Sequence, residues 1–384
     1  MELTIAFCGD IILASEVDRF IGKATAGEWL SGVASAWEGA DVLIGNLESP
    51  CVAEAKPLDG PVPELIFHAP ARRLGELAKA GFSAVTLANN HILNCGPSGL
   101  HETRQILDNV GIRHTGAGMN LDEAIRPAFI PVGSLTIGLV AFCYTPPAGR
   151  SHAGVAPCEP KWMRKALNLA RANADIVIAS LHDGLEYSDV PPSQTRQRFR
   201  FLAENGADIV FGHHPHVLQG LEWHGNVPIA YSLGDLLSHN SLPEVASRNF
   251  ARIAMGRLAP QEVARDRERF SRGAVLTVRI SGSNRAIHWH PFRQDASLRP
   301  QLSSGDDKLE DLKNLADLTG ALVNPKDRRH FIADEVIQTT IAEAMNNLKA
   351  RQLLRLACRP KWRYVPRGIN WLLKKTMRAW NVHK

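Results

Sequence analysis

Apolar runs of strand length alternate with segments of helical periodicity through the first 240 residues. A short continuous apolar run that ends at a glycine or a polar residue predicts a strand buried on both faces. Apolar residues spaced three and four positions apart predict helices that cover such strands. The predicted strands span residues 3–8, 41–44, 84–88, 176–181 and 209–211, and the predicted helices span 28–37, 71–80, 98–109, 161–172 and 194–204.

This alternation predicts an α/β protein whose helices lie outside its sheets. Two further segments, residues 129–144 and 274–290, predict β-hairpins. Each hairpin has a turn signal near its middle, Gly133-Ser134 in the first and Gly282-Ser283-Asn284 in the second.

The pattern changes after residue 237. Residues 238–272 are charged and weakly periodic, which predicts an irregular insertion. Beyond it we expect a capped helix over residues 306–318 and one or two long helices over residues 325–356. The chain therefore divides into a domain of residues 1–300 and a helical extension of residues 301–384.

Five segments place metal-binding side chains at, or just beyond, the end of a predicted strand. In α/β sheets the carboxyl ends of strands gather where ligands bind, so these side chains can converge on one site. Carboxylates, an amide oxygen and neutral imidazoles together suit a divalent metal ion. The segments are Gly9-Asp10, Gly45-Asn46-Leu47-Glu48, Asn89-Asn90-His91, Leu181-His182-Asp183-Gly184 and Gly212-His213-His214-Pro215-His216.

Taken singly, most of these residues have simpler explanations. An Asp after a strand commonly forms a turn or caps a helix, and adjacent Asn residues suit turns. A single His is more often an interior residue with a hydrogen-bond partner than a metal ligand. The imidazoles of His213, His214 and His216 differ, because three of them follow one buried apolar run and buried polar groups need partners. This histidine cluster favours a metal site.

The set and order of these segments resemble the bacterial capsule-synthesis CapA family, which is associated with poly-γ-glutamate capsules. The resemblance covers about 60% of the chain, from residue 3 to about residue 240. It implies a calcineurin-like metallophosphatase fold, a four-layer α/β/β/α sandwich, here followed by the C-terminal helical extension. The matching segments are Gly9-Asp10, residues 41–48, residues 87–91, His182 with residues 184–187, residues 212–219 and residues 231–234.

The resemblance also implies a site for two divalent metal ions, Mn, Fe or Zn, that activates water. In such a site Asp10 and His216 hold the first ion, and Glu48 bridges both. His91 is the catalytic side chain, which lies over the reacting group as a hydrogen-bond donor or general acid. The second ion is coordinated by Asn90, His182 and His214. Five further residues lie around the ligands or contact the substrate: Asn46, Asn89, Glu186, His213 and Asp235.

One position departs from the metallophosphatases and three depart from the CapA family pattern. The first phosphatase motif, Asp-x-His, ends here in Ile12, an absence of histidine that CapA-like sequences share, and this leaves the first ion three protein ligands. The family tends to carry an Asp shortly after the Asn-Asn-His segment, where this chain has Asn94. Its Leu-Gly-Asn motif appears as Gly234-Asp235, and its His-Trp-Gly motif as His182-Asp183-Gly184. Ile12, together with Glu48 in the bridging position where phosphatases usually have Asp, keeps open a second function, a non-catalytic capsule-assembly factor on the same scaffold.

The net charge of +5 hides two regions of opposite sign. Residues 344–384 contain no Asp or Glu and eleven Lys or Arg, interleaved with Trp and Leu, while residues 1–343 sum to −6. Such a tail predicts contact of residues 349–384 with an anionic membrane or an acidic polymer, or packing of its aromatic side chains on the body. No nucleic-acid recognition motif accompanies the charge, so we expect no nucleic-acid partner.

Length and composition exclude further classes. A chain of 384 residues that is 45% hydrophobic and 22% charged is neither disordered nor fibrous. No apolar run reaches the roughly 18 to 20 residues of a membrane-spanning helix, and the start of the chain does not read as a signal peptide. Six scattered cysteines predict reduced thiols. We therefore expect a cytoplasmic protein, free or attached peripherally to the inner membrane.

These features predict a metal-dependent hydrolase of capsule, poly-γ-glutamate or other exopolymer biosynthesis. A metal-activated water suits cleavage or transfer at either a phosphoester or an amide bond, so the bond stays open. The partner is then an anionic polymer, or a phosphorylated or acyl substrate. A nucleotide phosphodiesterase is a third alternative.

Overall fold

The computed structural model describes residues 2–13, 15–54, 67–240 and 268–323. Two mixed β-sheets form its centre, and the first has eight strands in the order β18-β17-β16-β1-β2-β5-β6, with β15 also paired to β1. Strands β1, β2, β5 and β6 are parallel, whereas β16, β17 and β18 are antiparallel. Their bounds are β1 Glu2–Ile11, β2 Val42–Leu47, β5 Ala84–Thr86, β6 Arg113–Thr115, β15 Asp235–Leu237, β16 Arg272–Ser281, β17 Asn284–Gln294 and β18 Pro300–Leu302.

The second sheet has six strands in the order β13-β14-β12-β11-β9-β8. Its four central strands are parallel, and an antiparallel strand closes each edge. Two short pairs, β3-β4 and β7-β10, lie outside both sheets. The bounds are β8 Ala128–Val132, β9 Leu135–Cys143, β11 Ile176–His182, β12 Ile209–His213, β13 Leu221–His224, β14 Val227–Ala230, β3 Cys51–Val52, β4 Ala69–Pro70, β7 Ala117–Gly118 and β10 Gly154–Val155.

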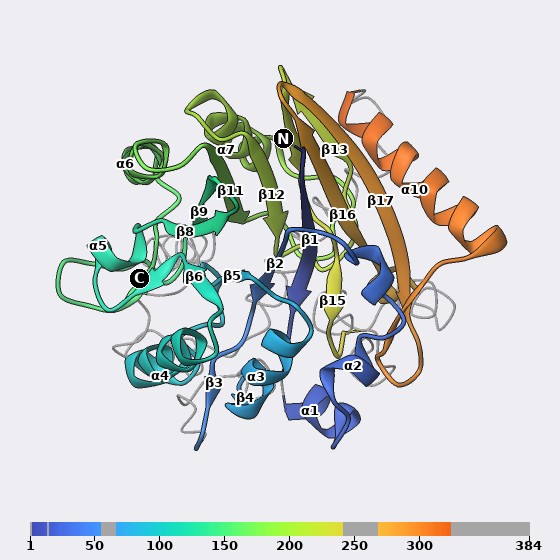
Figure 1. Cartoon of the computed structure of the whole chain (residues 1–384), viewed down its shortest axis with the longest axis horizontal. Coiled ribbons are helices and arrows are strands. Elements are labelled where there is room, and N and C mark those ends of the chain that lie inside the picture. Colours follow the sequence, from blue (N-terminus) through green and yellow to red (C-terminus); the bar gives the residue numbers. More distant parts are fainter. Residues whose placement is uncertain (1, 14, 55–66, 241–267, 324–384) are drawn as a thin grey trace, which may run out of the picture.

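Helices cover the outer faces of the two sheets. In Figure 1 the helices α3 and α4 lie on the opposite side of the molecule from α6 and α7, and α10 runs along the flank beside β17. The bounds are α1 Ser15–Ile21, α2 Ala26–Trp29, α3 Arg72–Lys79, α4 Gly96–Asn109, α5 Leu121–Ala124, α6 Pro160–Arg171, α7 Ser193–Glu204 and α10 Gly305–Val323.

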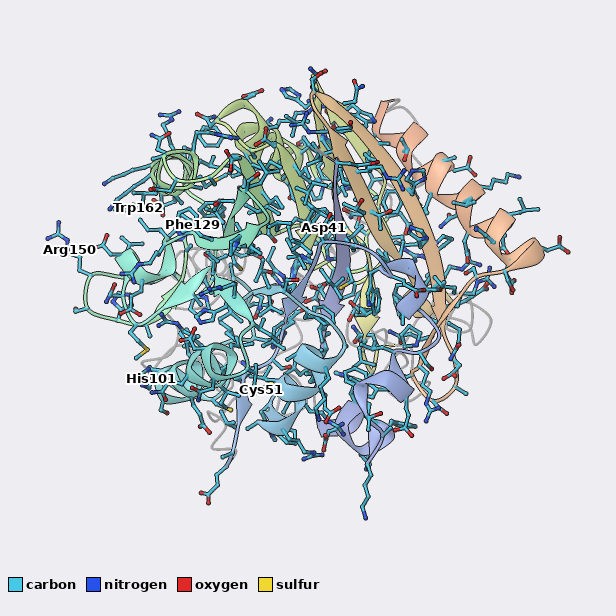
Figure 2. The ribbon with its side chains drawn as sticks, viewed as in Figure 1. Asp41, Cys51, His101, Phe129, Arg150 and Trp162 are labelled. Atoms are coloured by element: carbon cyan, nitrogen blue, oxygen red, sulfur yellow. The ribbon has the colours of Figure 1, made fainter. Side chains whose placement is uncertain are left out.

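Three apolar cores hold these layers together. The core between the sheets joins side chains such as Ile5 and Ile44 of the first sheet to Ile178 of the second. At its centre the rings of Phe7 and Phe211 lie 4.8 Å apart between centroids. The other two cores join the outer faces of the sheets to their helices. Side chains fill the spaces between the ribbons in Figure 2. The predicted four-layer α/β/β/α sandwich is confirmed.

Most predicted elements are confirmed within the described residues. The five predicted strands are β1, β2, β5, β11 and β12, and four of the five predicted helices are α3, α4, α6 and α7. Both hairpins form, as β8-β9 and β16-β17. The helix expected over residues 306–318 is α10, and it is longer than predicted. The five described cysteines are buried and form no disulfide.

The predicted helix over residues 28–37 is wrong. The chain there forms the short helix α2 and, after a break, a single 3₁₀ turn over Ala34–Ala36. The backbone oxygen of Gly32 in the break accepts a hydrogen bond from Leu302 N, just where β18 ends. A Cβ on Gly32 would lie 2.5 Å from the backbone oxygen of Pro300. Contact with β18 therefore overrides the local helical periodicity.

Two predictions fall largely outside the described residues. The expected insertion over residues 238–272 includes residues 241–267, and the expected helices over 325–356, with the basic tail, lie beyond residue 323. The division at residue 300 stays a prediction, although α10 packs its Leu315 and Leu318 against Leu218 and Ala274 of the body. No helix among the described residues combines the length and the apolar character needed to cross a membrane.

Candidate metal centre

The polar ends of several strands meet at one edge of the sandwich. The first sheet supplies Asp10 from β1 and Glu48, which follows β2. The second sheet supplies His182 at the end of β11 and His214, which follows β12. All four side chains are buried, with Glu48 and Asp10 fully inaccessible. The convergence expected from the strand ends is therefore present in the structure.

A first group of donor atoms comes from Asp10, His216 and Asp235. Asp10 and Asp235 are register partners on the parallel strands β1 and β15. The Nδ1 atom of His216 lies 2.8 Å from Asp235 Oδ1 and 3.6 Å from Asp10 Oδ2. One donor atom from each residue could bind the same metal ion, because these three atoms all lie within 4.8 Å of one another.

Further donor groups share residues with the first. Glu48 combines with His214 and His216 in one group, and with Asp10 and His182 in another. The Nε2 atom of His182 lies 3.4 Å from Glu48 Oε1 and 2.8 Å from Asn90 Oδ1. Because Glu48 belongs to both of these groups and Asp10 links one of them to the first group, the donor atoms form one continuous cluster.

The carboxylate of Glu48 shows that this cluster suits a cation. Both of its oxygens are buried, and neither accepts a hydrogen bond from any described residue. Burial, followed by the charge of Asp10, raises the pKa of Glu48 well above its ordinary value. A buried carboxylate without donors is costly unless a cation compensates its charge. The donor chemistry of the cluster, carboxylate oxygen with imidazole nitrogen, fits a divalent transition metal.

The imidazoles divide into two kinds. Burial lowers the pKa of His182, and the nearby His214 lowers it further. Burial also lowers the pKa of His214, so both rings are held in the neutral form that binds metal. Burial likewise acts to lower the pKa of His216, but the carboxylates of Asp235 and Glu48 raise it well above its ordinary value. The charges of these two carboxylates therefore favour the protonated form of His216.

The pKa of Asp10 is shifted in the opposite sense. Burial favours its neutral form, but the surrounding imidazoles, above all His213, hold the pKa well below its ordinary value. His213 Nδ1 lies 3.2 Å from Asp10 Oδ1, and the backbone N–H of His214 donates to Asp10 Oδ2 at 3.1 Å. Asp10 is thus ionised and oriented before any ligand binds.

The loop after β12 has an uncommon backbone. His214 has a φ of 101° and His216 a φ of 56°, in the left-handed region that side chains with a Cβ rarely adopt. Such conformations cost on the order of 1–3 kcal/mol each and persist where the surroundings enforce them. Pro215 lies between them, and its carbonyl accepts a hydrogen bond from the N–H of Tyr187. With this backbone, both imidazoles belong to donor groups of the cluster.

A hydrogen-bonded amide network supports the ligands. Asn46 donates to Asp10 Oδ1 at 2.7 Å, and its own oxygen accepts from Thr86 at 2.9 Å and from Asn89 at 3.2 Å. Asn240 donates to the second oxygen of Asp235 at 3.0 Å. Thr86 and Asn240 carry no signal in the sequence, because neither residue lies in a recognisable motif.

His91 lies beside the cluster rather than in it. Its Nδ1 atom is 3.0 Å from Asn94 Oδ1, and the ring of Phe67 stacks on the imidazole with centroids 4.0 Å apart. His91 belongs to none of the donor groups found among the described residues. Glu186 is half-buried and acts on the cluster through its charge, which acts to raise the pKa of both Glu48 and His214.

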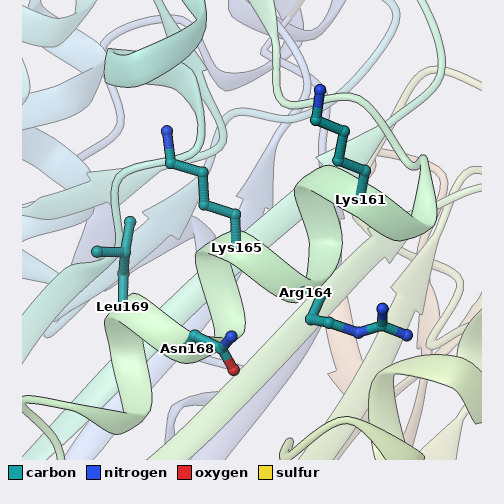
Figure 3. Close-up of a pocket in the computed structure, with 5 residues that line it drawn as sticks. All are labelled: Lys161, Arg164, Lys165, Asn168 and Leu169. Atoms are coloured by element: carbon teal, nitrogen blue, oxygen red, sulfur yellow. The ribbon is translucent and has the colours of Figure 1, made fainter.

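A groove on the outer face of the second layer of helices differs in character. Lys161, Arg164 and Lys165 line it together with Asn168 and Leu169, all from α6. Figure 3 shows Lys161 and Lys165 extending from the same side of that helix. Of these cations, Lys165 pairs with the exposed Asp122 at 3.1 Å, and Arg164 donates to the side-chain oxygen of Asn205 at 3.1 Å. This groove is a basic surface, separate from the candidate metal centre.

Residues 4–240 match the sequence model of a family described as bacterial capsule synthesis protein PGA_cap. Relatives include the PGA biosynthesis protein CapA of Bacillus subtilis, 29% identical over 61% of this chain and 63% of the relative. The capsule biosynthesis protein CapA of Bacillus anthracis is 27% identical over 62% of this chain and 60% of the relative. The matched region of the chain thus spans about three fifths of the length of these curated relatives.

Two solved structures are similar to this chain at low identity and with TM-scores below 0.5. A protein described as a novel phosphatase from Mycoplasma pneumoniae is 12% identical with a TM-score of 0.48, covering 82% of this chain and 99% of its own. A putative 5′-nucleotidase from Staphylococcus aureus is 13% identical with a TM-score of 0.42, covering 82% of this chain and 58% of its own.

Proposed function

This chain belongs to the family of bacterial capsule synthesis proteins, PGA_cap, and on that premise we propose that it is a metal-dependent hydrolase-like enzyme of capsule or exopolymer biosynthesis. The observation that carries the proposal is the buried carboxylate of Glu48, which has no hydrogen-bond donor among the described residues and faces imidazoles of the second sheet. The names of the Bacillus relatives support poly-γ-glutamate as the polymer.

Two adjacent divalent ions are the cofactors of this proposal. Asp10, Asp235 and His216 would hold the first, and Glu48 would lie between the two. Asp235 then supplies a fourth donor to the first ion, beside Asp10, His216 and Glu48. It compensates for Ile12, a fully buried apolar residue at the position where the phosphatase motif has a histidine ligand. The second ion would be held by His182, His214 and Asn90.

Such ions, once bound, lower the pKa of a water molecule and polarise a phosphoryl or acyl oxygen. The protein's own residues hold the ligands and orient the reacting groups. The donation from Asn46 fixes Asp10, and the contact with Asp235 fixes His216. His91, beside the cluster and hydrogen-bonded away from it through Nδ1, is in position to exchange a proton with the substrate.

The substrate class is an anionic polymer, or a phosphorylated or acyl group carried on it. The basic groove of α6 supports this assignment, because Lys161, Arg164 and Lys165 concentrate positive charge on an otherwise mildly acidic body. The basic tail of residues 349–384, which lies outside the described residues, adds a second contact with the polymer or with an anionic membrane.

Metal analysis joined to a substrate panel tests the proposal. Protein purified without chelator should hold close to two equivalents of Mn, Fe or Zn, and His214→Ala should lose metal and activity together. His101→Ala, an exposed residue of α4, is the matched control and should retain both. The panel holds phosphodiesters, nucleotides and γ-glutamyl peptides, and activity on one class identifies the bond.

The second candidate is a non-catalytic assembly factor on the same scaffold. The observation that favours it is Ile12, a buried apolar residue where the phosphatase motif carries a histidine ligand. A protein that binds no metal and cleaves no member of the panel would support this candidate and overturn the first. Cleavage that needs metal and disappears in His214→Ala would exclude it.

A further inference from the structure

The turn after β5 places Asn94 next to His91. The backbone N–H of Asn94 donates to the carbonyl of His91 at 2.8 Å, which closes a turn. Asn89 holds the start of this turn, since its side-chain oxygen accepts from the backbone N–H of His91 at 3.2 Å and of Ile92 at 2.9 Å. The segment Asn89 to Asn94 is therefore a hydrogen-bonded turn. The side chain of Asn89 bonds to the backbone of the turn, whereas the side chain of Asn94 contacts the ring of His91.

The backbone of Phe67 identifies which atom of the Asn94 amide faces His91. An amide's oxygen and nitrogen are told apart by their partners. Here the backbone N–H of Phe67, which can only donate, lies 2.8 Å from the same Asn94 atom that faces His91, so that atom is the oxygen. His91 Nδ1, at 3.0 Å from it, must then be the donor and must carry a proton.

The ring of His91 has little freedom beyond this contact. Phe67 stacks on it with ring planes 24° apart, and the rings of Phe67 and His239 form a T-shaped pair with centroids 5.2 Å apart. The Nε2 atom of His91 forms no hydrogen bond with any described residue. One nitrogen is thus committed to Asn94, while the other is left for a ligand.

We propose that Asn94 is a positioning residue that keeps a proton on His91 Nδ1, so that every proton the ring gives to or takes from a reacting group passes through Nε2. The role in catalysis rests on the proposed function. The location of the proton does not, because it follows from the contacts of Asn94 alone. An amide oxygen achieves this without adding a negative charge beside the metal centre.

Nitrogen NMR of the chelator-treated protein tests the proton location without metal or activity. In protein labelled with ¹⁵N-histidine, the His91 signals, assigned by their loss in His91→Gln, should show Nδ1 protonated and Nε2 without a proton when the ring is neutral. Finding the neutral ring protonated on Nε2 would overturn the proposal. Loss of metal binding with the expected proton location would overturn the proposed function and leave this inference standing.

Three variants separate positioning from support of the fold. Asn94→Leu removes the acceptor, so the ring should distribute its proton over both nitrogens. Asn94→Asp keeps an oxygen in place and should keep the proton on Nδ1. Phe67→Leu removes the stacking ring but neither the N–H nor the oxygen, and should also keep it. Should Asn94→Leu not fold, the measurement on the unsubstituted protein and on Asn94→Asp still decides the question.

The same variants have a kinetic readout on any substrate identified by the panel. General acid–base contributions are on the order of 10²–10⁴-fold, and a misplaced ring loses part of this. Asn94→Leu should lower kcat by at least about tenfold with KM nearly unchanged, and Asn94→Asp should restore most of kcat. An equal loss in both variants, or a change confined to KM, would contradict a positioning role.

Discussion

The backbone oxygen of Gly234 occupies the space that any side chain on residue 9 would need. An ideal Cβ built on Gly9 would lie 1.7 Å from this oxygen and 3.2 Å from the carbonyl carbon of Leu233. This close approach lets the N–H of Asp10 donate to the same oxygen at 3.0 Å. The two glycines therefore bring Asp10 and Asp235, the residues that follow them, side by side.

Replacing Gly9 with alanine should separate β1 from β15. The added methyl group meets backbone rather than a flexible side chain, so the strands must move apart, at a cost of about 3 kcal/mol or more. Urea denaturation should show this loss of stability, and metal analysis should show reduced binding because Asp10 and Asp235 no longer align.

Gly75→Ala is the control for this substitution. Gly75 lies inside α3, and a Cβ there would have no neighbour within 4 Å. Alanine should raise the free energy of unfolding by about 0.5–1 kcal/mol and leave metal binding unchanged. If Gly9→Ala proved as harmless as this control, the account of the strand contact would be wrong.

Glu48→Gln should affect the stability of the metal-free protein and that of the metal-bound protein differently. Because burial raises the pKa of Glu48, keeping it ionised at neutral pH costs stability in the chelator-treated protein, and an amide removes that cost. The variant without metal should therefore be at least as stable as the unsubstituted protein. Added Mn or Zn at about 100 times Kd should stabilise the unsubstituted protein by about 2.7 kcal/mol and the variant by much less.

Thermal unfolding after chelator treatment, with and without added ion, measures both effects. Glu38→Gln, on the exposed surface, should behave like the unsubstituted protein in each condition. A metal-induced rise in Tm that survives Glu48→Gln would contradict the role of Glu48 as the shared ligand.

The ion pair of Glu123 with Arg104 should make stability depend on pH. The hydrogen bond from Arg104 lowers the pKa of Glu123 in the folded protein, with a further contribution from the backbone N–H of Met119. A lowered folded-state pKa gives stability that is complete well above the unfolded value, about 4.3, and is lost as pH falls through the folded value. Glu123→Gln should therefore cost up to about 1 kcal/mol at pH 7.

Urea titrations at pH 7 and near pH 3 measure this difference. The cost of Glu123→Gln should shrink at the lower pH. Asp122→Asn, which alters an exposed pair with Lys165, should have little effect at either pH. A cost that stays constant between the two pH values would show that the carboxylate charge is not its source.

Charge reversal on α6 should weaken binding of an anionic polymer. Lys161 and Lys165 lie one helical turn apart, and both ammonium groups lie over the ring of Trp162. The pair of substitutions Lys161→Glu and Lys165→Glu should raise Kd for labelled poly-γ-glutamate about tenfold at low salt, and less at high salt because of screening.

Fluorescence anisotropy at two salt concentrations measures this effect. Lys79→Glu on α3, which belongs to the opposite helical layer, reverses a charge away from the groove and should change Kd little. Equal weakening by both sets of substitutions would indicate a general charge effect rather than a site on α6.

The sequence predicts the strand ends well because each end has two signals. An apolar run indicates the strand, and the polar residue that follows indicates where the strand ends. Asp10, His182 and His213 all lie at such ends, and the sheets bring them together. The residues assigned as metal ligands stay a proposal, but most of them lie within reach of one another, as convergent strand ends require.

The position of Asp235 could not be predicted in the same way. Its strand, β15, has three residues and pairs with β1 across a bulge, and no periodicity can be measured in so short a segment. From the sequence, Asp235 is therefore expected only around the ligands, whereas in the structure its carboxylate belongs to a donor group with Asp10 and His216. Only the pairing of two distant segments reveals this.

The donor atoms of the candidate centre are divided between the two sheets, with Asp10 and Glu48 on one and His182, His214 and His216 on the other. An ion bound by both sets of donors would link the two sheets at the edge where the apolar interior ends. Binding and release of the ion would then be coupled to small motions of one sheet relative to the other. Amide hydrogen exchange in β11 and β12 should slow when the ion is bound, even though their own hydrogen bonds are unchanged.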